Sequence, residues 1–214
     1  MGQAVRGGRR GTADLEGRLR TKLARLVALV RIMLGTEFLI NGLNWWVKLI
    51  GPYPSISDFA HHAPPPDFVG AMIQTGVMFH VVKATELLAG IALLTNRFVP
   101  LMLVAVFPVT VPVFIVDVIL IHHLRGFLMG TGAMLMNTFL LFSYLQCYRP
   151  MLNARAQPDS RSAEAAASAE SAACAESATA IPGPLMLVYG SLAAFFGAVI
   201  LIWVAVMMFQ YLTR

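Results

Sequence analysis

The chain has 214 residues, of which 57% are apolar and only 13% are charged, with a formal net charge of +5. Soluble globular domains average about 45–50% apolar and about 25% charged residues, so this composition excludes an ordinary water-soluble enzyme. The two cysteines are too few for a disulfide scaffold, and no cysteine and histidine spacing typical of a zinc site occurs. The composition therefore predicts a protein of the lipid bilayer.

The N-terminal arm, residues 1–25, is basic. Its first part, residues 2–11, is rich in glycine and arginine and is expected to be disordered. From Leu15 onward, leucines recur every three or four positions between basic residues. This spacing predicts an amphipathic helix that lies on the cytoplasmic lipid surface with its basic face toward anionic headgroups. The arm lacks the aromatic or glycine pattern of an RNA-binding module, so no nucleic acid partner is expected.

Five long apolar runs follow the arm. A helix needs about 20 residues to cross the ~30 Å hydrocarbon layer, because its backbone groups must be satisfied within the helix. We predict four spans over residues 26–50, 69–94, 98–121 and 127–148, and a fifth over 184–212. The predicted fold class is all-α: a four-helix transmembrane bundle at 26–150, an Ala/Ser/Glu-rich cytoplasmic linker at 151–182, and a C-terminal transmembrane helix at 183–214.

The distribution of lysine and arginine predicts the orientation of the chain. Most basic residues precede the first run or follow the second and fourth runs. Such residues concentrate on the cytoplasmic side of a membrane. The N-terminus is therefore predicted to be cytoplasmic, and five crossings of the inner (cell) membrane place the C-terminus on its outer side.

Polar side chains inside the predicted spans are the candidates for chemistry. A charge at mid-membrane costs about 2.5–3.5 kcal/mol by insertion scales and usually faces the bundle interior. His80, Lys83 and Glu86 follow at intervals of three, which places them along one side of the second span. Counting about 1.5 Å per residue along the spans puts Glu37 and Asn137 near the depth of the last two. The candidate buried cluster is Glu37, Asn41, His80, Lys83, Glu86, Asp117 and Asn137.

The charge balance of this cluster allows two interpretations. Lys83 can reach Glu86 on its own helix or Glu37 on the first, and with Asp117 the carboxylates outnumber the cations at this depth. A buried carboxylate without a partner cation takes up a proton, which a proton relay or a hydrogen bond to a quinone carbonyl would use. The alternative is a structural ion-pair network that fixes the register of the helices.

Two pairs of histidines lie near the outer surface. His61 and His62 belong to the first outer loop, and His122 and His123 stand at the outer end of the third run. Imidazole suits zinc, copper and iron, so these four residues are candidate metal ligands, with interfacial histidines that bind no metal as the alternative. Haem is not expected, because no histidine faces His80 at its depth.

Small residues predict helix contacts in the last two spans. Gly126 and Gly130 form a GxxxG pair at the start of the fourth run, and Gly190, Ala193 and Gly197 give the fifth run one small-residue face. The fifth run has no charged residue between positions 184 and 212. We expect it to pack either on its own bundle or on another subunit.

Residues 84–101, ATELLAGIALLTNRFVPL, resemble the DoxX and DoxX-like membrane family. That family has a glutamate followed by a small-Gly-aliphatic pattern in its second span and an Arg-Phe-x-Pro-like start to its third. Asn41-Gly42-Leu43 is similar to its Asn/Gly element at the end of span one. The resemblance covers about residues 31–150 and implies a four-helix bundle that accompanies respiratory or sulfur-redox complexes feeding electrons to quinone. The positions that carry it are Asn41, Gly42, Glu86, Gly90, Arg97, Pro100 and Pro108.

Two functions from different classes are compatible with these features. The first is a non-catalytic accessory or assembly subunit of a redox or energy-converting membrane complex, whose partners are lipid and other membrane subunits or further copies of itself. The second is a quinone-interacting oxidoreductase subunit that uses the buried Glu/Lys cluster for proton transfer, with quinone as the candidate cofactor.

Overall fold

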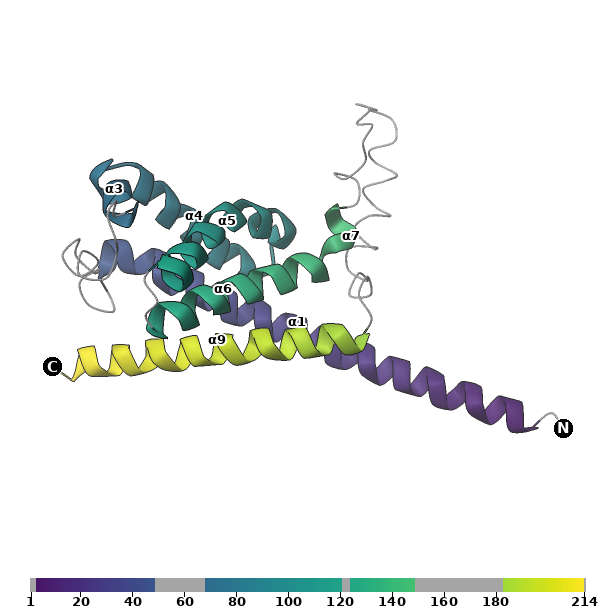
Figure 1. The fold of residues 1–214 in the computed structure, drawn as a ribbon. Coiled ribbons are helices and arrows are strands. Elements are labelled where there is room, and N and C mark those ends of the chain that lie inside the picture. The colour runs from purple at the N-terminus through teal and green to yellow at the C-terminus, as the bar shows by residue number, and fades with distance from the viewer. Residues whose placement is uncertain (1–2, 49–67, 121–123, 149–182, 214) are drawn as a thin grey trace, which may run out of the picture.

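A computed structural model describes residues 3–48, 68–120, 124–148 and 183–213, and every regular element in these ranges is a helix. The elements are α1 (Gln3–Val47), α3 (Phe68–Gln74), α4 (Met78–Thr95), α5 (Val99–Phe114), the π-helix η1 (Ile115–Leu120), α6 (Leu124–Ser143), α7 (Leu145–Tyr148) and α9 (Gly183–Leu212). Helix α1 packs along α9 on one side of the bundle, with α4, α5 and α6 above them (Figure 1). The predicted all-helical fold is confirmed for these ranges.

Four helical stretches are long and apolar enough to cross a membrane: Met78–Thr95, Val99–Ile119, Gly126–Ser143 and Gly183–Val206. They overlap the predicted second, third, fourth and fifth spans. Helix α1 covers the first predicted span but is not among the four, so a crossing by residues 26–50 stays a prediction. Large apolar side chains such as Leu88 and Phe195 are exposed on the outside of the bundle, as expected for a surface in contact with lipid.

The N-terminal arm continues α1 without interruption. The helix begins at Gln3 and projects beyond the rest of the bundle (Figure 1). The expectation of disorder is therefore wrong for residues 3–11. A helix that is already formed adds residues at its end far more easily than it starts, and the packed part of α1 provides that start. The position of the arm on the lipid surface stays a prediction.

The second apolar run is not one helix, as predicted, but two. Helix α3 ends at Gln74 and α4 begins at Met78. Between them Gly76 has a φ of +72°, a conformation that glycine adopts without steric cost. The Thr75 hydroxyl accepts a hydrogen bond of 3.1 Å from the Met78 backbone N–H, which satisfies a donor at the start of α4. The predicted span at 69–94 is thus wrong at its N-terminal end.

The turn between α4 and α5 is fixed to α1 by a side-chain contact. Asn96 adopts a left-handed conformation, with a φ of 57°, and ends α4. Asparagine tolerates this conformation better than most residues. Arg31 of α1 donates a hydrogen bond to the Asn96 side-chain oxygen, which places a cation near the C-terminus of α4, where the helix dipole favours it.

Helices α1 and α4 are antiparallel and touch through their backbones. A Cβ atom at Gly90 would lie 2.5 Å from the backbone nitrogen of Leu39, and one at Gly42 would lie 2.7 Å from that of Leu87. Only glycine permits so close an approach, which is how membrane helices gain packing contacts. Gly42 and Gly90 are also two of the positions that carry the family resemblance.

Helix α9 runs parallel to α1 with contacts spaced seven residues apart. The glycine contacts are Gly183 with Leu19, Gly190 with Leu26 and Gly197 with Met33. A step of seven on both helices is the spacing of coiled-coil packing. Phe139 and Met136 of α6 cover Gly190 and Gly197 from the other side. The small-residue face of α9 is therefore buried within its own bundle.

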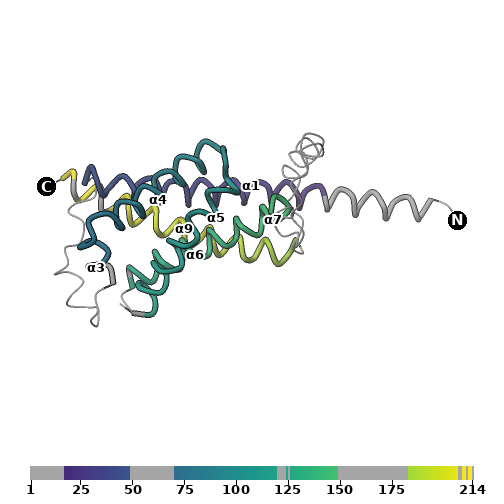
Figure 2. The backbone as a smooth tube through the Cα atoms, turned by 90° about the horizontal axis from the view of Figure 1, so that it is seen from above, coloured from purple at the N-terminus to yellow at the C-terminus, as the bar shows by residue number. Residues whose placement is uncertain are grey.

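The apolar core lies mostly in the half of the bundle that holds the α4–α5 turn, and Phe38 and Ala89 extend it to the level of Glu37 and Gly90. We call the part on the turn side the dry core; it includes Val30, Leu34, Leu93, Leu103, Val106, Met136, Phe139 and Leu140. Leu93 comes near the end of α4, whereas Leu103 comes near the start of α5, so both lie close to the turn. Figure 2 gives the view from above, in which α1 runs the length of the bundle.

Replacing Gly90 with alanine is expected to destabilise the bundle. The new Cβ would meet the backbone of α1 at 2.5 Å, so the two helices must separate, at a cost of about 1–3 kcal/mol. Gly17→Ala is the matched control, because a Cβ there meets nothing within 4 Å. Thermal unfolding in detergent should give a lower midpoint for Gly90→Ala and no decrease for Gly17→Ala. Equal midpoints for Gly90→Ala and the wild type would contradict the backbone contact.

Candidate functional site

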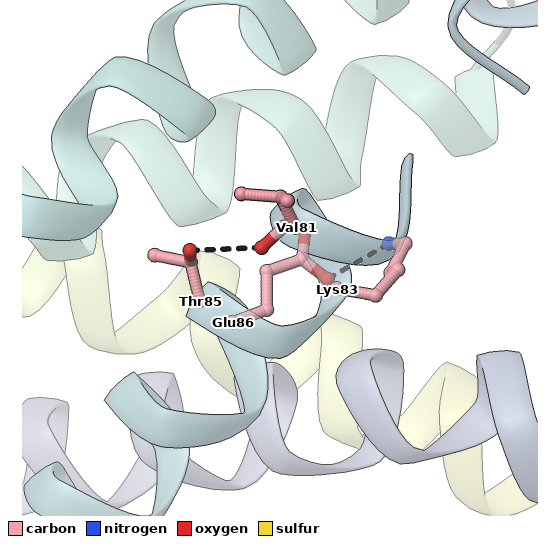
Figure 3. Close-up of polar contacts among 4 residues, drawn as sticks. All are labelled: Val81, Lys83, Thr85 and Glu86. Carbon is pink, nitrogen blue, oxygen red and sulfur yellow. Dashed lines mark hydrogen bonds and ion pairs between the residues drawn. The ribbon is translucent and has the colours of Figure 1, made fainter. Parts of the chain in front are cut away.

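Lys83 and Glu86 form a buried ion pair on α4. Lys83 Nζ lies 2.7 Å from Glu86 Oε2, and the two residues are only 4% and 2% exposed (Figure 3). The ammonium also lies 5.3 Å from the centroid of the Phe79 ring, within the range of a cation–π interaction. The sequence allowed two partners for Lys83, Glu86 and Glu37, and in the structure Lys83 contacts Glu86.

The sequence of α4 explains why this pair faces inward. Its buried residues recur at alternating steps of three and four, which places them on one stripe of the helix. They include Phe79, Lys83, Glu86, Gly90 and Leu93. Gly90 brings this stripe against α1, so that α1 covers the pair and keeps it from lipid.

Glu37 of α1 is the second buried carboxylate. It is 6% exposed, and its Oε2 atom has no hydrogen-bond partner. Its charge interacts electrostatically with Glu86, Lys83 and Asp117. A buried acceptor without a partner costs about 1–3 kcal/mol, so Glu37 is not accounted for by helix packing alone.

Asp117 is half-buried and lies in the π-helix η1. It packs against the GxxxG pair of α6: a Cβ at Gly130 would lie 3.1 Å from the Asp117 Cβ, and one at Gly126 would lie 3.3 Å from it. The predicted helix contact of these glycines therefore accommodates a carboxylate. Single π-helical turns within helices are often found at functional sites.

Asn137 of α6 is fully buried and pairs with α5. Its Nδ2 donates a hydrogen bond of 3.1 Å to the Thr110 hydroxyl, which in turn donates to the Val106 carbonyl oxygen at 3.1 Å. Its Oδ1 atom has no hydrogen-bond partner. Sequence reasoning missed Thr110. The signal was available, because a buried amide requires a partner from a facing helix and Thr110 is the hydroxyl residue in the middle of the third run.

His80 does not belong to the buried cluster, contrary to the prediction. Its side chain is exposed, its Nδ1 lies 2.8 Å from the Gly76 carbonyl oxygen, and its ring stands edge-on to Trp45. Each step of three residues turns about 60° short of a full helical turn, so a residue six positions from Glu86 has left the buried stripe. Phe79 occupies the inward position instead. Asn41 is half-buried.

The polar residues also do not share one depth, as predicted, but form a column. Leu39 of α1 lies against Gly90 of α4. Glu86 comes four residues before Gly90, and Glu37 comes two residues before Leu39. Because the two helices are antiparallel, these offsets point in opposite directions, so Glu86 and Glu37 differ in depth by six residues, about 9 Å. Asn137 lies seven residues beyond Gly130, or about 10 Å along α6. We call this set the polar column: Lys83, Glu86, Glu37, Asp117, Asn137 and Thr110.

The candidate metal ligands His61, His62, His122 and His123 lie outside the described residues. Within the described ranges, no group of three His, Cys, Asp or Glu side chains is close enough to hold a metal ion. A metal site at the histidine pairs stays a prediction.

An all-helical bundle with an apolar exterior and charges turned inward is the structure of a multi-pass integral membrane protein embedded in the lipid bilayer. Residues 26–123 match the family model named DoxX, and this match supports membership of the DoxX family for that segment. The matched segment contains Glu37, Lys83, Glu86 and Asp117, whereas Asn137 lies beyond it. No curated protein and no solved structure gives a significant match.

Removing one member of the ion pair should cost more stability than removing both. Lys83→Met leaves the Glu86 carboxylate buried without its cation, and breaking a buried pair in this way costs about 3–5 kcal/mol. The double variant Lys83→Met/Glu86→Leu removes both charges and should recover most of the loss. Unfolding in denaturing detergent measures the two single variants, Lys83→Met and Glu86→Leu, and the double variant. If the losses of stability in the two single variants simply add in the double variant, a direct interaction between Lys83 and Glu86 is contradicted.

Proposed function

We propose that this protein is a membrane subunit that handles protons for a quinone-linked redox complex, with the polar column as its proton-handling site. The observation that carries the proposal is an excess of acid. Glu37, Glu86 and Asp117 interact electrostatically with Lys83, which is the one buried lysine or arginine among the described side chains.

The chemistry of quinone reduction fits such a site. A quinone takes up two electrons and two protons to form a hydroquinone. A partner subunit would supply the electrons, and the carboxyl groups of this chain would supply and recover the protons. Lys83 compensates the charge of Glu86, so Glu37 and Asp117 are the carboxyls left to carry the protons, since a buried carboxyl without a cation of its own takes up a proton.

The structural alternative, an ion-pair network that fixes the register of the helices, accounts for part of the site. It explains the contact between Lys83 and Glu86. It does not explain Glu37, because the unpartnered Oε2 atom of this residue stabilises no contact. An apolar residue at position 37 would serve a purely structural role better, since replacing buried charges by apolar groups is often neutral or stabilising.

The test is complementation of a strain that lacks the chain. Glu86→Gln removes the acid while retaining the size of the side chain, and quinone-linked electron transfer in its membranes should fall roughly a hundredfold, the low end of proton-transfer effects. Thr85→Val is the matched control on the same helical turn, because the Thr85 hydroxyl bonds only the Val81 carbonyl oxygen of its own helix (Figure 3). Immunodetection in membranes checks that both variants are present in equal amounts.

Full electron transfer in the Glu86→Gln strain would contradict a proton-handling role. The same strain then tests the second candidate function, an accessory or assembly subunit. If the chain serves only to keep the partner complex at its normal amount, expression of either Glu86→Gln or Thr85→Val restores that complex and its activity.

The outer face of α9 favours this second candidate. Its large apolar side chains recur at steps of three and four and are strongly exposed; they include Leu185, Val188, Leu192, Phe195, Ile202 and Phe209. An uncharged face of this kind can pack on lipid or on the apolar helices of a larger complex. Purification in mild detergent followed by mass spectrometry should recover the chain with larger membrane subunits. Recovery as a stable monomer from native membranes would count against this candidate.

A further inference from the structure

We propose that the polar column exchanges protons with one end of the bundle only, the end formed by α3, and that His80 is the residue through which the protons pass. This inference rests on the proposed function and adds to it the side of access and a proton-exchange site. It follows from where the ionisable groups lie, how His80 is held, and what separates the two.

Lys83 and Glu86 lie on the α3 side of the dry core, and Glu37 lies at its edge, level with Leu93. Lys83 and Glu86 are in the first half of α4, toward α3, whereas Leu93 of the dry core lies near its end. Between Glu37 and the α4–α5 turn, the described interior is mostly apolar, with Val30, Leu34, Leu103, Met136 and Leu140 fully buried. Its further polar groups are hydroxyls, such as those of Ser143 and Thr138, and Arg31, whose guanidinium does not give up its proton. The described interior on this side therefore has no carboxyl, imidazole or amine that could pass a proton to the turn end.

Asn137 and Thr110 do not open the turn end. They lie among the residues of the dry core, and their mutual hydrogen bond ends on the Val106 carbonyl oxygen of α5. Neither an amide nor a hydroxyl gains or loses a proton readily at neutral pH. The carboxyl and amine groups of the polar column therefore lie only from Glu37 toward α3.

His80 is positioned to exchange protons at the α3 end. It is exposed on the first turn of α4, close to α3. A carbonyl oxygen can only accept a hydrogen bond, so His80 Nδ1 carries the hydrogen that it donates to Gly76 at 2.8 Å. In the neutral ring the other nitrogen, Nε2, then has a free lone pair. The contact with Gly76 thus prepares His80 as a proton acceptor.

Two aromatic rings separate His80 from the ion pair. The Trp45 ring stands edge-on to both the His80 ring, at 5.3 Å, and the Phe79 ring, at 4.6 Å. The Phe79 ring in turn covers the Lys83 ammonium. Phe79 is buried, whereas His80 is exposed. The rings form a plug that a proton passes when Lys83, on its flexible stem, moves past Phe79 or when a water molecule enters beside it.

The charged groups facing the ion pair come from three elements. Lys83 and Glu86 belong to α4 itself, Glu37 comes from α1, and Asp117 comes from η1. Among its described residues, α6 contributes no charged side chain to the site: Gly126 and Gly130 pack against Asp117, and Asn137 is an amide. A proton delivered by His80 therefore reaches a site in which carboxyls outnumber amines, and one of these carboxyls binds the proton.

The test uses the full chain in sealed lipid vesicles sorted by an affinity tag at the N-terminus, so that the α3 end faces either outward or inward. The external pH is changed with a membrane-impermeant buffer, and the carboxyl C=O band is followed by infrared spectroscopy. The band should respond promptly when the α3 end faces outward. In the opposite orientation the carboxyl band should respond only as fast as the pH inside the vesicle changes, which a dye enclosed in the vesicle reports.

Three variants test the route. His80→Gln keeps an amide donor for Gly76 but cannot take up a proton, and it should slow the response roughly a hundredfold. Phe79→Ala removes the plug and should accelerate it. Thr95→Val, at the other end of α4, removes a hydroxyl bonded to Ile91 of the same helix and should leave the rate unchanged.

The possible failures are distinguishable. An equal response from both sides would overturn the one-sided access but leave the proposed function intact. An unchanged rate in His80→Gln would overturn the role of His80. A carboxyl band that responds from neither side would overturn the proposed function itself, and with it this inference.

Discussion

The arrangement of this bundle depends on one constraint, the cost of placing a charge in hydrocarbon. Helix α4 carries Lys83 and Glu86 within an apolar segment, and both must turn away from lipid. Their mutual contact lowers the cost of burial but does not remove it, because each ion still loses its water. The remaining cost must be met by packing, and this requirement fixes which face of α4 points inward and which helix covers it.

Glycine makes that cover possible. Gly42 and Gly90 let α1 and α4 touch at the backbone, so that α1 lies directly over the inward stripe of α4. Gly126 and Gly130 serve Asp117 in the same way, by leaving room beside α6 for a carboxylate. Charged and small residues are thus two parts of one solution: the charge requires an inward face, and the glycine allows a neighbour to close on it. The excess of carboxyls that remains is the feature on which the proposed function in proton handling rests.

The sequence predicted the parts of this structure that depend on composition and charge. Apolar runs predicted the helices, and the cost of a buried charge predicted that Glu37, Lys83, Glu86 and Asn137 lie inside, as they do. It did not predict features that depend on local turns or on contacts between helices. The break at Gly76 depends on a single φ angle, and the outward position of His80 depends on the angular drift of a three-residue step. The depths of Glu37 and Asn137 depend on the register of packed helices, which counting from the ends of apolar runs cannot provide.

The central claim is that the buried carboxyls bind and release protons in response to a quinone. Isothermal titration calorimetry of the purified protein with a soluble quinone analogue, repeated in buffers of different ionisation enthalpy, counts the protons exchanged on binding. The account predicts a measurable proton count for the wild type and a smaller count for Glu37→Gln. A proton count of zero in both proteins, with the analogue bound, would contradict it.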